Sequence, residues 1–204
     1  MDFFERAPRP PDLPPSQAVM VPGRPVNMMG TPVAIDLLLS RSATAAVRVQ
    51  HLTAFPTGLE FEVVAHFRPT ADTWDPMHGL AGLRGKPGDE YGELSDEHLR
   101  FGVEFADGRK ATNVGPPMWS VAVGTEGPML HPGAGGAGES MAHTTYWLWP
   151  LPPPGPLAFV CEWPKYRVPL TRQEIDGGLL LAAATQAIEL WPEGPEGGSA
   201  DDSS

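Results

Sequence analysis

Hydrophobic residues recur at every second position in several segments of this chain, and this period constrains the fold more than any other feature. Side chains on a β-strand point alternately to two faces, so each such segment has one apolar face and one polar face. The pattern predicts antiparallel β-sheet with one face on a core. It is clearest at 59–67 and returns at 99–105 and 157–163. In the first segment the apolar positions are Leu59, Phe61, Val63, Ala65 and Phe67.

Pro and Gly mark the turns between these segments. Phe55-Pro56-Thr57-Gly58 separates a strand predicted at 46–54 from the strand at 59–67, which predicts a hairpin. Asp107-Gly108 predicts a tight turn with a positive φ, followed by a short return over 109–113. The proline-rich stretch 150–156 lies between the aromatic-rich segments 143–149 and 157–163, which we expect to form a second hairpin.

Weaker strand patterns at 33–39 and 116–123 bring the expected total to about seven or eight short strands. Strands of this length with regular turn signals are typical of two packed sheets. The sequence therefore predicts a mainly β fold, an immunoglobulin-like or similar antiparallel β-sandwich, with one C-terminal α-helix. The Gly-rich run 133–138 has the spacing of a dinucleotide fingerprint, but no strand precedes it and no helix follows it. We expect a flexible loop there.

The helix has two possible starts. Thr171-Arg172-Gln173-Glu174 matches a capping box, whereas the helix-disfavouring pair Gly177-Gly178 argues for a start at Asp176, with Asp176 as the cap. Pro192 is expected to end the helix. Helical spacing predicts one buried apolar stripe. Its members are Leu180, Ala184, Ala187, Ile188 and Trp191.

Composition divides the chain into three parts. Residues 1–32 are rich in proline and are predicted to be a flexible arm, and 193–204 are predicted to be a disordered acidic tail. Between them, 33–192 should form a single β-sandwich domain with the helix. A long polar insertion, 69–98, interrupts the domain, and connections of this length are often functional or disordered.

The formal net charge is −11, from 25 acidic and 14 basic residues. Binding to nucleic acid or to anionic membranes relies on Lys and Arg, so both functions are disfavoured. The single cysteine excludes an intrachain disulfide, and no basic-then-apolar leader is present at the N-terminus. We expect a cytoplasmic protein. The preference for Arg over Lys, with abundant Ala, Gly and Pro, suggests a bacterial source.

No catalytic signature stands out, so we expect that the protein is not an enzyme and uses no cofactor. Cys161 lies on an apolar strand face and is expected to be buried and inert. The carboxylates Glu60, Glu62 and Glu104 are expected on solvated strand faces. A competing hypothesis is a metal-dependent hydrolase built from His78, His98 and an acidic loop. The acids of that loop, in 89–97, are Asp89, Glu90, Glu93, Asp96 and Glu97.

The favoured hypothesis is a non-enzymatic protein-interaction or structural module. Phe3 and Phe4 would anchor the proline-rich arm to a partner, and the acidic tail would attract a basic one. An alternative is a carbohydrate-binding β-sandwich, in which exposed tryptophans stack on sugar rings. Trp147 and Trp149, with Trp74, are the candidates for that platform or for a protein contact.

Overall fold

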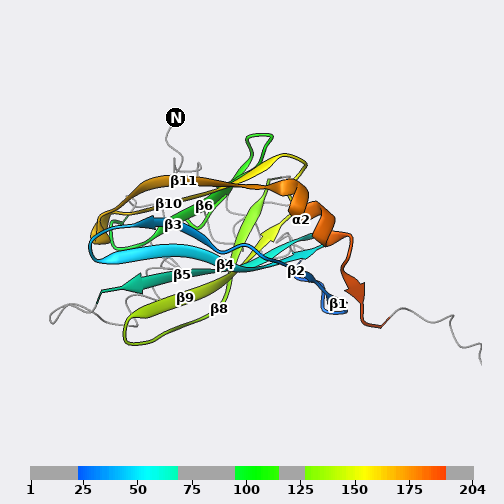
Figure 1. Cartoon of the computed structure of the whole chain (residues 1–204), viewed down its shortest axis with the longest axis horizontal. Coiled ribbons are helices and arrows are strands. Elements are labelled where there is room, and N and C mark those ends of the chain that lie inside the picture. The colour runs from blue at the N-terminus through cyan, green and yellow to red at the C-terminus, as the bar shows by residue number, and fades with distance from the viewer. Residues whose placement is uncertain (1–22, 69–94, 115–126, 192–204) are drawn as a thin grey trace, which may run out of the picture.

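The computed structural model describes residues 23–68, 95–114 and 127–191. This part of the chain is mainly β, with antiparallel sheets and one α-helix (Figure 1). The helical elements are η3, a 3-10 turn at Pro164–Tyr166, and α2 at Gly177–Ala184. The strands are β1 (Met28–Met29), β2 (Thr31–Val33), β3 (Leu37–Arg41), β4 (Ala45–Phe55), β5 (Gly58–Phe67), β6 (Arg100–Glu104), β7 (Lys110–Thr112), β8 (Met129–Ala137), β9 (Met141–Trp149), β10 (Pro156–Trp163), β11 (Val168–Asp176) and β12 (Ile188–Glu189).

The strands form three sheets. The largest has the order β2-β4-β5-β9-β8, with β3 also paired to β4, and the second has the order β11-β10-β6-β7. In Figure 1 the second sheet lies over the first, and α2 lies at one end of both. The third sheet is a two-stranded ribbon of β1 and β12 beside α2.

The two larger sheets share one hydrophobic core. The apolar positions predicted on β5, from Leu59 to Phe67, are all buried, which confirms the alternation. The ring centroid of Phe61 on β5 lies 6.0 Å from that of Phe101 on β6 and 5.3 Å from that of Phe159 on β10. Side chains from both sheets therefore pack into the same interior. Helix α2 adds Leu180 to this core.

The predicted turns at Gly58 and Gly108 are confirmed. Phe55 and Gly58 are register partners at the end of the β4–β5 hairpin. Gly108 has a φ of +83°, and its backbone N–H donates to the carbonyl of Phe105. Glycine reaches this left-handed region without the steric penalty of a Cβ, so the Asp-Gly pair connects β6 tightly to β7.

The predicted hairpin between 143–149 and 157–163 is wrong. β9 pairs with β5 and β8, whereas β10 pairs with β6 and β11 in the other sheet. The proline-rich connection therefore carries the chain from one sheet to the other. Most residues of β10 are buried, which suits a central strand covered on both faces rather than one arm of an exposed hairpin.

The loop predicted over the Gly-rich run is also wrong for most of its length. Residues 129–137 form β8, paired with β9 and shifted in register between Pro132 and Gly135. β8 lies at one end of the strand order of its sheet, as an edge strand. Pro and Gly are tolerated at edges and bulges because fewer ladder hydrogen bonds depend on them there.

The helix begins at the second of the two predicted starts. The side chain of Asp176 accepts a 2.8 Å hydrogen bond from the N–H of Gly178, as an N-cap does. The capping box at Thr171 is not used, because 171–174 pair with β10. The helix ends at Ala184, earlier than predicted. Of the predicted stripe, Ile188 and Trp191 are exposed, since the chain pairs with β1 after the helix instead of continuing it.

Strand pairing begins before Val33, within residues that the sequence assigns to the arm. β1 pairs with β12 and β2 pairs with β4, so 28–33 are tied to two sheets. The strand predicted at 33–39 is divided between β2 and β3. The strand predicted at 116–123 lies outside the described residues. Among the residues that the structure does describe, no helix is long and apolar enough to cross a membrane.

Candidate functional site

The tryptophans predicted to form a platform lie on the outer face of β9. Tyr146 and Leu148 point into the core, and Trp147 and Trp149 alternate with them. Trp147 is nevertheless only 7% exposed, because its ring packs edge-on against Phe55 with a centroid distance of 5.7 Å. Trp149 is half-buried. Trp147 therefore presents little ring surface to a ligand.

Most of the remaining predicted site residues lie outside the part of the chain that the structure describes. Phe3, Phe4, Trp74 and His78 lie outside the described residues, as do the acids before residue 95. Two acids of the predicted acidic loop are described, and each is taken up by an ion pair. Asp96 bonds Arg100 at 2.9 Å, and Glu97 bonds Lys165.

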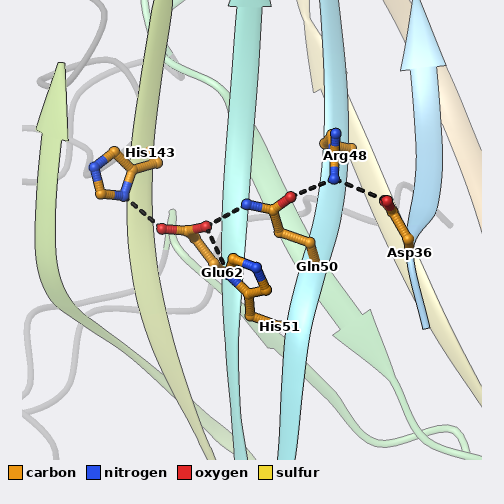
Figure 2. A network of polar contacts seen from close by, with 6 residues as sticks. All are labelled: Asp36, Arg48, Gln50, His51, Glu62 and His143. Atoms are coloured by element: carbon orange, nitrogen blue, oxygen red, sulfur yellow. Dashed lines mark hydrogen bonds and ion pairs between the residues drawn. The ribbon is translucent and has the colours of Figure 1, made fainter. Parts of the chain in front are cut away.

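A cluster of polar side chains crosses the outer face of the six-stranded sheet (Figure 2). Glu62 of β5 is its centre, because the neighbours Phe61 and Val63 point into the core and leave the Glu62 side chain on the opposite face. Side chains from β4 and β9 contact Glu62, and Asp36, the residue before β3, joins the network through Arg48. We call this the Glu62 cluster. Its members are Asp36, Arg48, Gln50, His51, Glu62 and His143.

Both oxygens of the Glu62 carboxylate have partners. Oε1 lies 2.5 Å from Nδ1 of His143, and Oε2 accepts from Nε2 of Gln50 and lies 3.2 Å from Nδ1 of His51. Arg48 extends the cluster by donating to Gln50 and, at 2.8 Å, to Asp36. Figure 2 shows that the two imidazoles approach the carboxylate from different strands.

A β-bulge places His51 in this cluster. The register between β4 and β5 shifts between Gln50 and Thr53, and His51 has a φ of +54°. On a regular strand Gln50 and His51 would point to opposite faces, whereas the bulge turns both toward Glu62. A left-handed conformation at a residue other than Gly is uncommon, and it persists only where the surrounding structure holds it.

Gly136 makes room for the second imidazole. It is the register partner of His143 on β8, and a Cβ built at Gly136 would stand 2.9 Å from Nε2 of His143. Real Cβ atoms do not come this close, so the ring position depends on glycine there. The bulge positions His51 and the glycine at 136 leaves room for His143, so the two imidazoles reach the Glu62 carboxylate from the two strands that flank β5.

The Glu62 carboxyl is held in its ionised form. Burial opposes ionisation, but hydrogen bonds from Gln50 and His143 and the charges of His143 and His51 outweigh it and lower the pKa of Glu62. The side chain is 17% exposed. Each imidazole turns its Nδ1 to this carboxylate, and among the described residues no group of His, Cys, Asp and Glu is arranged to hold a metal ion.

Cys161 has the buried position that the sequence predicts. Its side chain is enclosed in the core, and burial raises the pKa of the thiol to about 12. A thiol with this pKa carries almost no thiolate at neutral pH and is a poor nucleophile. His131 on β8 is the register partner of Trp147 and is half-buried, and burial lowers the pKa of its ring. Neither of its ring nitrogens has a hydrogen-bond partner within the described part of the chain.

The second candidate site is the ribbon formed by β1 and β12 with the residues beside them. Five large apolar side chains are exposed along it, although most residues of this kind are buried elsewhere in the described chain. Met29 and Ile188 are register partners and are 52% and 54% exposed. We call this the apolar ribbon. Its exposed members are Val26, Met29, Ile188, Leu190 and Trp191.

Sequence reasoning missed both sites for identifiable reasons. The cluster joins residues from 36 to 143, and local patterns do not show which strands become neighbours. For Glu62 the alternating pattern predicts a polar side chain on the outer face of its strand, and it indicates nothing about the partners. Ile188 and Trp191 of the ribbon were assigned to the buried face of a helix that ends before them.

Comparison with known proteins identifies no relative: no family model matches the chain, and neither a curated protein nor a solved structure matches it.

Proposed function

We propose that this protein is a non-enzymatic protein-interaction module and that it contacts its partner through the apolar ribbon. The observation that carries the proposal is the exposure of the ribbon's apolar side chains, from 44% at Leu190 to 91% at Val26. Scattered apolar residues on a surface are ordinary, but a contiguous group is typical of a contact surface for another protein. The ribbon collects five such residues on two short paired segments.

The ribbon's backbone supports the same proposal. Within the described residues β1 and β12 pair only with each other, so each has one outer edge without a neighbouring strand. Leu190 continues the pairing by donating its N–H to the carbonyl of Asn27 at 2.7 Å. A two-stranded sheet is marginal by itself, and an added strand from a partner would bond to an open edge.

The Glu62 cluster fits a structural role better than a catalytic one. Its carboxylate is already bonded on both oxygens, and its imidazoles use their Nδ1 atoms on that carboxylate. Such a chain of contacts links β4, β5 and β9 across one face of the sheet. This supports the assignment of function to the ribbon rather than to the cluster.

Two finer features belong to the same proposal. A β-sandwich, immunoglobulin-like or similar, is supported by the ring contacts that Phe61 makes with Phe101 and Phe159 of the other sheet. A cytoplasmic location is supported by the single, buried Cys161, since the fold uses no intrachain disulfide.

Site-directed photo-crosslinking in the native host tests the function. A photoreactive amino acid in place of Ile188 should give one discrete crosslinked protein. The control places the same group at Leu170, an exposed residue of β11 that is 53% accessible and lies outside the ribbon. The crosslink should disappear when Met29→Ser is added. Equal crosslinking from positions 188 and 170, or none from 188, would reject the proposal.

A glycan array tests the alternative that the protein binds carbohydrate. Retention of the labelled chain on an oligosaccharide, abolished by Trp147→Ala in a variant that keeps its circular dichroism spectrum, would replace the protein-interaction proposal.

A further inference from the structure

We infer that the occupant of the apolar ribbon is an extended, basic segment of a partner protein, in which Lys or Arg alternates with aliphatic residues. This inference rests on the proposed function and adds the chemistry of the partner.

The alternation follows from the two faces of β12. Ile188 lies with Met29 on one face, and the next residue, Glu189, points to the other. A strand added along the open edge of β12 would repeat this alternation in its own side chains. Aliphatic residues would meet Ile188, and the residues between them would meet Glu189.

The polar side of this edge favours a cation. Glu189 is exposed, and its carboxylate accepts a 3.2 Å hydrogen bond from Nδ2 of Asn27. Trp191, two residues further on, is 69% exposed. A carboxylate and an indole this close in the chain provide an ion pair and a ring face for Lys or Arg, and Arg suits both because its planar guanidinium also stacks on aromatic rings.

The charge of the chain favours the same partner and disfavours a second copy. The net charge is −11, and residues 192–204, which follow Trp191 directly, carry no Lys or Arg. A second copy would bring an equal negative charge and place Glu189 near its counterpart, whereas a basic segment is attracted. The acids of 192–204 are Glu193, Glu196, Asp201 and Asp202.

Binding of two synthetic peptides to the full chain tests the inference. Both alternate Val with a charged residue, which is Lys in one and Glu in the other, and fluorescence anisotropy of a dye on the peptide reports binding. We expect the Lys peptide to bind at least about tenfold more tightly than the Glu peptide. Its binding should weaken in about 0.5 M salt, which screens exposed charges.

Variants assign the binding to the ribbon. The pair Met29→Ser and Ile188→Ser should remove most binding of the Lys peptide, and Glu189→Gln should weaken it several-fold. The matched control Leu170→Ser, on β11, should leave it unchanged. Binding of the Lys peptide that persists in the double variant would show attraction to the net charge alone and would overturn the inference.

Three other results separate failure of the inference from failure of the function. A crosslinked partner at position 188, together with equal binding of the two peptides or binding of neither, would overturn the inference and leave the function in place. A concentration-dependent dimer in sedimentation that Ile188→Ser abolishes would identify a second copy as the occupant. Loss of both the crosslink and the peptide binding would reject the inference and the function together.

Discussion

The Glu62 cluster and the apolar ribbon differ in how their side chains find partners. In the cluster, polar groups from three strands bond to each other, and the chain adopts a left-handed residue at His51 to bring in the last partner. In the ribbon, apolar side chains are exposed next to a backbone edge that pairs with no other strand among the described residues. The Glu62 carboxylate is mostly buried, and a buried charge is costly unless it is paired, so its partners are supplied within the chain. The ribbon's exposed apolar side chains are instead available to a partner outside the chain.

We therefore expect changes at the six-stranded sheet to alter the stability of the fold, and changes at the ribbon to alter binding alone. The largest effect should come from the core side of β5. Phe61 lies directly beneath the cluster and touches three aromatic rings across both sheets, so Phe61→Ala should reduce the free energy of unfolding by about 3–5 kcal/mol. Urea denaturation measures this. A loss under about 1 kcal/mol would mean that the two sheets do not share this core.

A smaller effect is expected on the cluster side of the same sheet. Gly136→Ala places a Cβ against the His143 ring, which must move and weaken its bond to Glu62. We expect a loss of about 1–2 kcal/mol in urea denaturation, typical of overpacking. The same substitution in a His143→Ala background should cost much less, since the ring that it displaces is gone. Equal losses in the two backgrounds would show that the cost arises elsewhere on β8.

The sequence predicts the features that depend on residues close together in the chain. Alternation identifies the buried face of β5 correctly, because side-chain direction on a strand is a local property. Asp107-Gly108 and the Asp176 cap are also predicted, since each depends on two or three adjacent residues. In these places the backbone geometry and the residue type specify the same structure.

Predictions fail where the neighbour is distant in sequence. Nothing in the sequence of 143–163 shows that β9 and β10 enter different sheets. The capping box at Thr171 does not start a helix, because 171–174 pair with β10 instead. Glycines that suggest a loop at 133–138 fit an edge strand equally well. The Glu62 cluster depends on the register of three strands, and the two-residue period gives the face of Glu62 but not its partners.

The pH dependence of stability tests whether the Glu62 cluster stabilises the fold. The pKa of Glu62 is lower in the folded chain than its ordinary value of 4.5. A depressed carboxyl pKa stabilises the fold above the unfolded value, and this contribution is lost as the pH falls through the folded value. The wild type should therefore lose more stability than Glu62→Gln between pH 5 and the acid limit. The difference should stay under about 1 kcal/mol, since solvent screens the pair partly.

Urea denaturation of both proteins across this pH range isolates Glu62, because every other carboxylate is common to the two. Parallel curves would show that the contacts to Gln50, His51 and His143 do not favour the ionised form.

We expect the smallest effect on stability at the ribbon. Its size shows whether the apolar side chains there stabilise the fold or contact a partner. Met29→Ser and Ile188→Ser together should change the free energy of unfolding by no more than about 0.5 kcal/mol, because both side chains are already about half in water. Urea denaturation beside the Leu170→Ser control checks this. A loss above about 2 kcal/mol would mean that the ribbon anchors the end of the chain to the fold, so its apolar residues would be explained without a partner. An unchanged midpoint, combined with loss of the crosslink from a photoreactive group at position 188 when Met29→Ser alone is added, would leave a contact outside the chain as the reason for keeping these side chains apolar.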